Sequence, residues 1–507
     1  GKTGEIGSFL TREHSWPKQW WGGMKNSAYS DLFHVILGDA HVNGQKGIKP
    51  LGEVGEQFNE WAISKTGLGR EGLGYDGEVF EPADEYKGDF ARGYLYFAVR
   101  YLTGKNCLNC SVSEMIQDNG FDFEPWAIRM LMKWHKADPV SNREIKRNNE
   151  IYKIQGNRNP FIDHPEFADL IWKNNFHTGV DANYSIGMIE NGKKWESEKI
   201  NNIFEIFKNK GINSLRMRIW TCDTGPNSID YAIKIAKECN KNNIAPYIVL
   251  FLSDNWSDYV KQPLPEKWKK LLFSDKVKEV REYSKSVVSV FMKNGIVPQM
   301  YEIGNEIDFG ICGEFENEWH NRFNLEYMKK NIWIKSAQII EAAQKGILEE
   351  DKNAKFILHL TQWWNEKFCI EFYNFMLENN VKIDFLGLSF FPTSNMSEKN
   401  GFDYFESKIN QLSNSLKRKI IICEYAYPSK YDFGGQFSEW NKSVKDYDLN
   451  EKGQAKWIND FLTLCRENDN LQGAYYWSPE WFDSEMWEAF SLFNADGTAK
   501  EGINSFK

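Results

Sequence analysis

Beyond about residue 175, the chain alternates between short apolar segments and longer segments of helical periodicity. Apolar runs of this length predict buried strands, and the helical segments between them predict parallel strands joined by helices. We predict eight strands, in chain order His177–Ser185, Asn213–Trp220, Ala245–Leu252, Val297–Glu306, Lys355–Leu360, Asp384–Phe391, Lys419–Tyr425 and Gly473–Ser478.

Eight strand and helix units in roughly 330 residues are typical of a (β/α)8 barrel. A doubly wound sheet would also alternate, but no glycine-rich phosphate loop follows the first predicted strand. We therefore predict an α/β protein with a C-terminal (β/α)8 TIM barrel over residues 177–507.

The preceding residues, 1–173, are of a different kind. Helical periodicity prevails in Phe90–Leu102 and Glu124–Pro139, and β-branched runs are few. This pattern predicts a mainly helical α+β domain. The junction at 172–177 has no Pro, Gly or Ser, so we expect little free linker between the two domains.

Composition narrows the function classes. The formal net charge is −9, so the chain lacks the global basic field that dominates nonspecific nucleic-acid binding. No apolar run approaches the length that spans a membrane. Aromatic residues make up 15% of the chain and include 20 Trp, which suits sugar-stacking surfaces as well as core packing.

Two glutamates close predicted barrel strands. Glu306 follows Gly304 and Asn305 at the end of the fourth strand, and Glu424 ends the seventh behind four apolar residues. Active sites of these barrels lie at the C-terminal strand ends, and carboxylates about 5 Å apart suit a retaining glycosidase. Glu306 would stay protonated and Glu424 ionised before the reaction. Strand-end carboxylates that bind amides or arginines are the alternative.

From about Gly179 onward the chain resembles glycoside hydrolase family 53, the arabinogalactan endo-β-1,4-galactanases. The matching stretches are "GVDANYS", "LRMRIW", "SDNWSDYVKQPLPEKW", "PQMYEIGNEI", "ILHL", "DFLGLSFFP", "IICEYAYP" and "GAYYWSPEW". The resemblance implies that Glu306 is the acid/base, that Glu424 is the nucleophile, and that Asn305 binds the sugar 2-hydroxyl.

The same resemblance implies further substrate-binding residues. Charged side chains would bind hydroxyls and indoles would stack on sugar faces, although core packing remains open for the tryptophans. One departure concerns the specificity, since Val249, Leu250 and Phe251 stand where the family usually has Asp-Phe-His. The implied binding residues are Asp181, Arg218, Trp220, Asp254, Trp256, His359, Trp477 and Trp481.

Near the N-terminus, Glu13 and His14 are adjacent, and Asn43 precedes Gly44 in a predicted turn that opens a helix. Phosphodiester hydrolysis needs a divalent cation and a base that activates water. A carboxylate and an amide oxygen suit Mg²⁺, and a neutral histidine suits the base. The alternative is an aromatic core segment, because adjacent side chains on a strand point to opposite faces.

The first domain is similar to the bacterial endonuclease I family, whose fold carries a ββα-metal motif. The matching stretches are "REHSWPKQWW", "VNG", "FEPADEYKGDFAR", "LMKWHKADPVS" and "NNEIYKIQGNRNPFIDHPEF". This resemblance implies His14 as general base, Glu13 and Asn43 as ligands of Mg²⁺ or another divalent cation, and Arg158 as a phosphate contact. A structural salt bridge is the alternative for Arg158, and Trp16, Trp20 and Trp21 are expected to pack in the core.

The domain departs from that family at several positions. Phe33 and His34 stand where the family usually has two consecutive histidines. Residues 46–49 read Lys-Gly-Ile-Lys instead of an Arg-Ser-Asn-Tyr-like run. The helical segment that normally precedes the Glu-His strand is absent, so we expect the domain to be incomplete at its N-terminus.

The resulting hypothesis is a retaining endo-β-1,4-galactanase barrel fused to a metal-dependent, non-specific endonuclease-like domain. Expected partners are β-galactan or arabinogalactan and, for the first domain, DNA or RNA. Both families are typically exported, which implies a secreted or periplasmic location. Two alternatives remain: a glycan-binding protein with an inactive nuclease-like domain, or a nuclease joined to a barrel of other β-glycosidase specificity.

Overall fold

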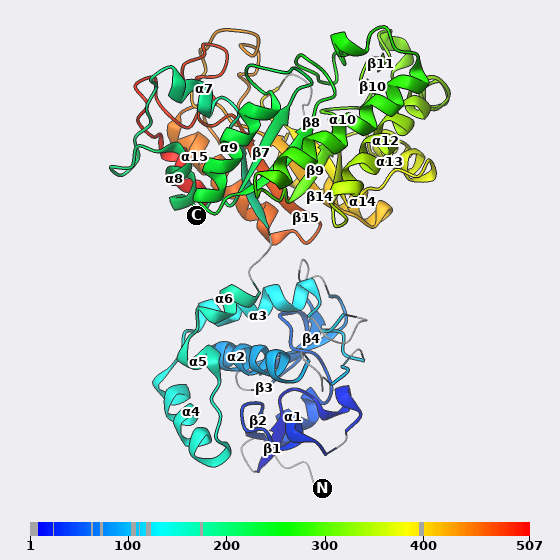
Figure 1. The fold of residues 1–507 in the computed structure, drawn as a ribbon. Helices are drawn as coiled ribbons and strands as arrows, with labels where there is room; N and C mark the ends of the chain where they lie inside the picture. The colour runs from blue at the N-terminus through cyan, green and yellow to red at the C-terminus, as the bar shows by residue number, and fades with distance from the viewer. Residues whose placement is uncertain are drawn as a thin grey trace. The chain divides into compact units, whose positions relative to one another are not determined.

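The computed structural model divides the chain into two compact units, residues 1–175 and 176–507 (Figure 1). The residues that the structure describes are 9–23, 25–61, 64–70, 73, 75–102, 108–110, 112–117, 123–172, 176–394 and 400–507.

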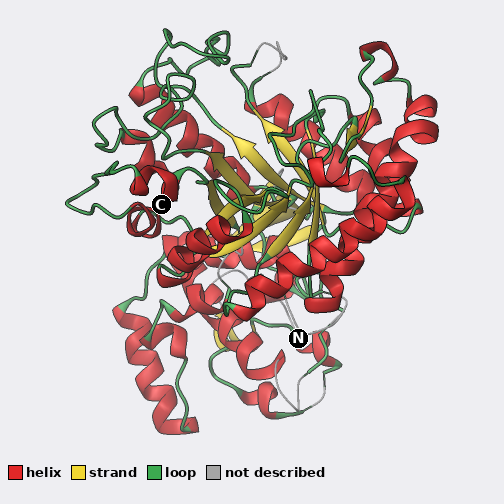
Figure 2. Cartoon of the chain, turned by 45° about the horizontal axis from the view of Figure 1, so that its top comes forward, coloured by secondary structure: helices red, strands yellow, loops and turns green. Residues whose placement is uncertain are grey.

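The second unit is a closed barrel of eight parallel strands in chain order, which confirms the predicted fold. Figure 2 shows its strands surrounded by helices. Its strands and helices are β6 (His177–Asp181), α7 (Ser185–Glu190), α8 (Ile203–Asn209), β7 (Ser214–Ile219), α9 (Ile229–Lys241), β8 (Ala245–Leu250), α10 (Phe273–Lys293), β9 (Met300–Ile303), β10 (Gly310–Ile311), β11 (Glu314–Phe315), α11 (Leu325–Met328), α12 (Ile334–Glu350), β12 (Phe356–Leu360), α13 (Glu366–Glu378), β13 (Phe385–Phe390), α14 (Phe402–Leu416), β14 (Lys419–Tyr425), α15 (Glu451–Glu467) and β15 (Leu471–Trp477).

Two strands end three or more residues before their predicted ends. The first ends at Asp181 rather than Ser185, because the Tyr184 amide donates to the Glu480 carboxylate and Ser185 opens α7. The fourth ends at Ile303, so Glu306 lies in the loop beyond β9 rather than on the strand. Both differences place polar residues at the mouth of the barrel.

Alternation along each barrel strand separates two apolar layers. Side chains facing the helices belong to one extended core, whereas those facing inward form a second cluster. The inner cluster is Tyr247, Val249, Phe251, Met300, Ile357, Ile421, Cys423 and Tyr475. The barrel interior is therefore filled by side chains, and the site lies above this filling.

The first unit combines two small antiparallel sheets, β1-β2 and β3-β4-β5, with helices. The strand pair β1-β2 leads directly into α1, which gives the ββα order that the sequence implied. Trp16, Trp20 and Trp21 are buried in the core of this unit. Its elements are β1 (Leu10–His14), β2 (Val35–Asp39), α1 (Ala40–Lys46), β3 (Val54–Trp61), β4 (Ser64–Gly69), β5 (Glu78–Glu81), α2 (Lys87–Phe97), α3 (Pro125–Ala137), α4 (Asn142–Gln155), α5 (Pro160–Asp163) and α6 (Phe167–Ile171).

Asn43 lies inside α1, so the prediction that it precedes the helix in a turn was wrong. Asp39 caps α1, since its carboxylate accepts from the amides of His41 and Val42 and the helix thus begins at Ala40. Among the described residues, no helix is both long and apolar enough to cross a membrane.

Candidate active sites

A strained loop after β9 carries Glu306 into the mouth of the barrel. Gly304 has φ +76°, and a Cβ there would lie 2.4 Å from Ile307 Cγ2. Glu306 itself has φ +48°, a left-handed conformation that costs free energy for a non-glycine residue. Such strain persists only where the surroundings hold it, and it directs the Glu306 carboxyl toward β13 and β14.

Glu424 lies near the end of β14 and meets Glu306 across one cavity of about 300 Å³. In the strand register it pairs with Ser389 of β13, next to a register shift between Leu388 and Ser389. Both glutamates are more than nine-tenths buried. The aromatic side chains lining the cavity are Trp256, Tyr259, Trp363, Trp364, Phe391, Phe437, Trp440, Trp477 and Trp487.

Burial raises the pKa of both glutamates, but different neighbours oppose that shift in each of them. Burial and the nearby Glu424 and Asp258 carboxylates raise the pKa of Glu306 well above its usual range, against one hydrogen bond from Ser389. Burial also raises the pKa of Glu424, to about 7, but the Arg216 guanidinium opposes it. Glu306 is therefore the carboxyl that keeps its proton, and Glu424 is the one that ionises first.

Arg216 of β7 is the electrostatic centre of the site. Its fully buried guanidinium lies 2.8 Å from Asp181, 2.6 Å from Glu302 and 2.7 Å from Glu424, measured from nitrogen to carboxylate oxygen. It also donates to Asn305 Oδ1 at 2.7 Å. Arg216 was not among the site residues predicted from the sequence. Its signal was the pattern Arg-Met-Arg within an apolar strand, which places the arginines 216 and 218 on one face.

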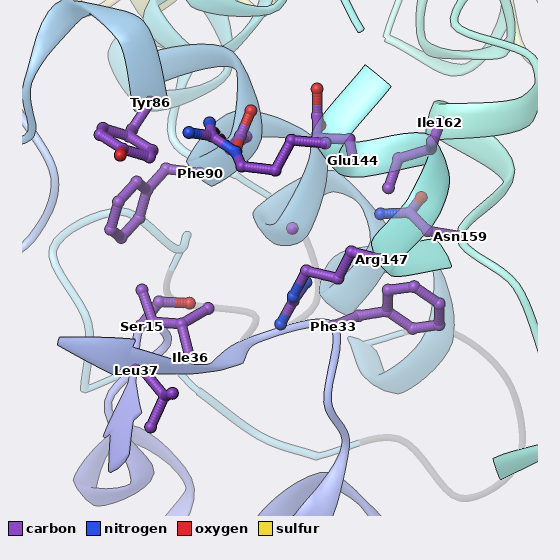
Figure 3. Close-up of a pocket in the computed structure, with 13 residues that line it drawn as sticks. Ser15, Phe33, Ile36, Leu37, Tyr86, Phe90, Glu144, Arg147, Asn159 and Ile162 are labelled. Atoms are coloured by element: carbon purple, nitrogen blue, oxygen red, sulfur yellow. Dashed lines mark hydrogen bonds and ion pairs between the residues drawn. The ribbon is translucent and has the colours of Figure 1, made fainter. Parts of the chain in front are cut away.

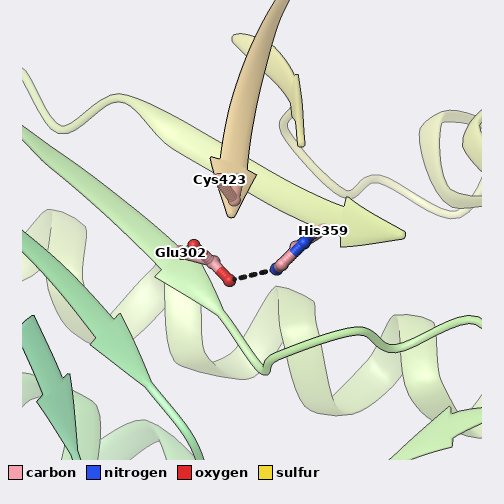
Figure 4. Close-up of side chains that lie close together, drawn as sticks. All are labelled: Glu302, His359 and Cys423. Carbon is pink, nitrogen blue, oxygen red and sulfur yellow. Dashed lines mark hydrogen bonds and ion pairs between the residues drawn. The ribbon is translucent and has the colours of Figure 1, made fainter. Parts of the chain in front are cut away.

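Beneath the two glutamates, Glu302, His359 and Cys423 converge from β9, β12 and β14 (Figure 4). Their ligand atoms lie within 4.8 Å of one another, as in a metal site. However, both Glu302 oxygens already accept hydrogen bonds from Arg216, and one also accepts from Tyr247. Because Arg216 supplies the positive charge there, this cluster does not fit a cation.

Of the other implied residues, Asp181, Asn305 and His359 lie in the Arg216 network. Asn305 also donates to the Ser257 carbonyl at 2.9 Å. Arg218 is buried among aromatic rings, 4.9 Å from the Tyr184 centroid. Trp256 and Trp477 line the cavity.

Three other implied residues, Asp254, Trp481 and Trp220, neither line the cavity nor hydrogen-bond to the Arg216 guanidinium. Asp254 accepts from Thr221 and from the Glu266 amide, and Trp481 stacks on Tyr184 at 3.8 Å. Trp220 lies 6.4 Å from Phe251, centroid to centroid. These contacts brace the walls of the site.

The third barrel strand ends in apolar residues where the family usually has Asp-Phe-His. Val249, Leu250 and Phe251 are fully buried, and the Phe251 ring packs 5.7 Å from Trp256. An apolar residue thus supports a wall where the family usually has polar groups. The wall of this chain is more apolar at that point than the family pattern implies.

In the first unit, the carboxylate of Glu13 faces α1, where it forms a 3.0 Å ion pair with Lys46. The Lys46 side chain is only 2% exposed. On the same face of β1, Asn43 donates to Thr11 Oγ1 at 3.0 Å. Strand alternation sends His14 to the opposite face, where its Nε2 lies 2.9 Å from the Tyr29 carbonyl oxygen.

These residues do not fit a divalent cation as they stand. Asn43 and Glu13 share one face, as a pair of ligands would, but the Lys46 ammonium occupies the position beside the carboxylate that a cation would take. Burial lowers the pKa of Lys46, and the Glu13 charge opposes that effect. The arrangement around Glu13 therefore does not support a metal-dependent step.

Two further residues have structural partners. Arg158 donates to both carboxylate oxygens of Asp163, at 2.6 and 2.7 Å. This is the salt bridge that was the alternative prediction to a phosphate contact. His34, at a position where the family has histidine, is buried with Nε2 2.6 Å from the Ala28 carbonyl, and burial lowers its pKa to about 4.

A cavity of about 260 Å³ lies between β2 and the helices α2 and α4 of this unit (Figure 3). Arg143 pairs with Asp89 at its rim, and Arg147 reaches across it to donate to the carbonyls of Leu32 and Val35. Burial and the Glu144 charge raise the pKa of Asp89 to about 6. These pairings join α4 to α2 and β2, which indicates a bracing role.

The second unit has the site of a (β/α)8 glycoside hydrolase: two buried carboxyls in one aromatic-lined cavity, contributed by the fourth and seventh barrel strands or the loops that follow them. Residues 177–506 match the family model described as glycosyl hydrolase family 53. The chain belongs to that family. Residues 1–166 match the model described as endonuclease I.

Relatives of both units are known. The endo-beta-1,4-galactanase of Bacillus subtilis is 24% identical over 69% of this chain and 80% of its own length. The GH53 catalytic domain of Ignisphaera aggregans superposes with a TM-score of 0.57 at 23% identity, covering 66% of this chain and 96% of that one, which supports the fold.

An extracellular ribonuclease of Bacillus amyloliquefaciens is 37% identical over 33% of this chain. The match spans 55% of that ribonuclease's length. The chain therefore combines a family 53 glycoside hydrolase barrel with an endonuclease I-like unit.

Proposed function

We propose that the barrel hydrolyses β-1,4-galactan or arabinogalactan internally, with retention of anomeric configuration. One observation carries the proposal: Glu306 and Glu424 face the same cavity, and only Glu424 is paired with an arginine. The names of the galactanase relatives support the choice of substrate. The retaining outcome follows from assigning Glu424 as nucleophile rather than as base for a water.

The reaction would proceed in two halves. In the first, a Glu424 oxygen bonds to the anomeric carbon while the glycosidic bond breaks and its oxygen takes the Glu306 proton. In the second, Glu306 accepts a proton from water, whose oxygen displaces Glu424 from the anomeric carbon. Arg216 orients Glu424 and favours its ionised form. Asn305 supplies an amide hydrogen for the 2-hydroxyl, and the tryptophans of the cavity stack on sugar rings.

A substrate and product assay tests this proposal. With β-1,4-galactan we expect new reducing ends, an early fall in viscosity, and oligosaccharides whose first-formed anomer is β by proton NMR. Xylan and β-glucan, incubated in parallel, are the controls. Galactan binding by isothermal titration calorimetry without any turnover would instead support a glycan-binding protein.

We also infer that the protein acts outside the cell, as the relatives named extracellular ribonuclease do. The same relatives support nucleic acid as a partner of the first unit, with His14 as the candidate base. Cleavage there would require a divalent cation beside Glu13, where the Lys46 ammonium already lies. We propose that this lysine restricts cation affinity.

Replacing Lys46 with Met should strengthen Mg²⁺ or Mn²⁺ binding about tenfold, since it removes a positive charge 3.0 Å from Glu13. Isothermal titration of the full chain with each metal chloride measures the change. Lys49→Met is the matched control, because Lys49 is partly exposed and pairs with Glu78 instead. Unchanged or weaker binding in Lys46→Met would show that Lys46 does not occupy the cation position.

A further inference from the structure

A chain of hydrogen bonds leads from the barrel interior to Glu306. Ser389 Oγ lies 2.6 Å from Glu306 Oε1 and 2.8 Å from His359 Nε2. His359 Nδ1 in turn lies 2.9 Å from Glu302 Oε1. All three supporting side chains are buried, so solvent does not replace these contacts.

The innermost member sets the direction of the chain. Despite its burial, the nearby Arg216 and His359 lower the pKa of Glu302 to about 2, so this carboxylate is ionised and accepts only. His359 must therefore carry its hydrogen on Nδ1. Because burial lowers the pKa of His359, the ring is neutral and its Nε2 is an acceptor.

The hydroxyl hydrogen of Ser389 therefore has two possible acceptors, His359 Nε2 and the Glu306 carboxyl. When Ser389 donates to His359, its oxygen faces Glu306 as an acceptor, which suits a protonated Glu306. When Glu306 is ionised, the same hydroxyl can turn and donate to the carboxylate. No proton leaves Ser389 in either case; only the direction of its O–H bond changes.

We propose that Ser389 is a positioning residue whose hydroxyl reverses direction with the protonation state of Glu306, and that Glu302 and His359 hold it in place. The proposal rests on the assignment of Glu306 as acid/base. In the free enzyme Glu306 keeps its proton until a glycosidic oxygen competes with Ser389 for it. In the covalent intermediate Ser389 stabilises the ionised Glu306 that must activate water.

Several charged groups around Glu306 also affect its titration. They are Glu424 of β14, Asp258 and Tyr259 in the loop after β8, and Asp308 in its own loop. Arg216 acts through its contact with Glu424. Ser389 differs from these groups because it is a neutral hydrogen-bonding partner of the carboxyl itself, and it can be replaced without changing any charge.

The experiment compares pH profiles of Ser389→Ala, Ser389→Thr and His359→Leu. Loss of the Ser389 donor removes a hydrogen bond to the ionised form, so the alkaline limb of kcat/KM should move upward by about one pH unit. Ser389→Thr retains the hydroxyl and should stay near the wild type. His359→Leu frees the hydroxyl for Glu306, so its alkaline limb should move downward.

A second readout needs no substrate. Infrared difference spectra against Glu306→Gln report the protonated Glu306 carboxyl directly, and they should give the same shifts. If galactan is not hydrolysed but the spectra shift as expected, the proposed function fails while the role of Ser389 stands. An unshifted titration in Ser389→Ala, or shifts of the same sign in Ser389→Ala and folded His359→Leu, would overturn the proposal. The two Ser389 variants decide the matter even if His359→Leu does not fold.

Discussion

Replacing Glu424 with Gln should reduce galactan hydrolysis by at least ~10³-fold. The amide has nearly the same shape but is a poor nucleophile and cannot pair electrostatically with Arg216. Glu306→Gln removes the proton donor and should also slow hydrolysis severely, by about 10²- to 10⁴-fold. Reducing-end assays at matched protein concentration measure both losses.

The two variants should differ in a second respect. A substrate with a good leaving group, such as a nitrophenyl galactobioside, needs little help from an acid in the first half-reaction. It should therefore restore the glycosylation step in Glu306→Gln but not in Glu424→Gln. Glu282→Gln, on the exposed face of α10, is the control with the same chemical change. Rescue of Glu424→Gln by the activated substrate would reverse the two assignments.

Replacing Arg216 with Met should lower the free energy of unfolding by about 3–5 kcal/mol, because it leaves several buried carboxylates without their cation. The pKa of Glu302 shows how this stabilisation depends on pH. Its pKa is about 2 in the folded protein, so its stabilisation is present above its unfolded pKa and is lost as the pH falls toward 2. Denaturant titration near neutral pH should therefore show the full loss.

Arg281→Met is the matched control for this substitution. Arg281 pairs with Glu349 on the surface, where an ion pair contributes about 1 kcal/mol or less. Arg216→Met should also raise the pKa of Glu424, which moves the acid limb of the pH profile to higher pH. If both arginine variants unfold alike, the buried ion pairs do not hold the barrel together.

Much of the barrel was predictable from the sequence, because its strands are buried on both faces and read as apolar runs. The eight predicted segments all contain strands of the closed barrel. Glu424 was predictable for the same reason, since an acidic residue that ends an apolar run is conspicuous. The bounds near Ser185 and Glu306 were less accurate, because hydrogen bonds to distant residues and a left-handed turn decide them.

Residues that act through neighbours from other strands could not be predicted in this way. Nothing near Ser389 in the sequence indicates that it contacts Glu306, since a register shift in the sheet sets its position. The pairing of Lys46 with Glu13 likewise depends on how α1 packs against β1.

The sequence by itself therefore determined the order of the elements, the two families and the two glutamates, because periodicity and local motifs are properties of neighbouring residues. Only the tertiary structure decided which charges meet. Asp181, Glu302 and Glu424 come from three strands far apart in the chain, and closure of the barrel brings all three onto Arg216. Burial then strengthens those contacts, because water is excluded from the space they share.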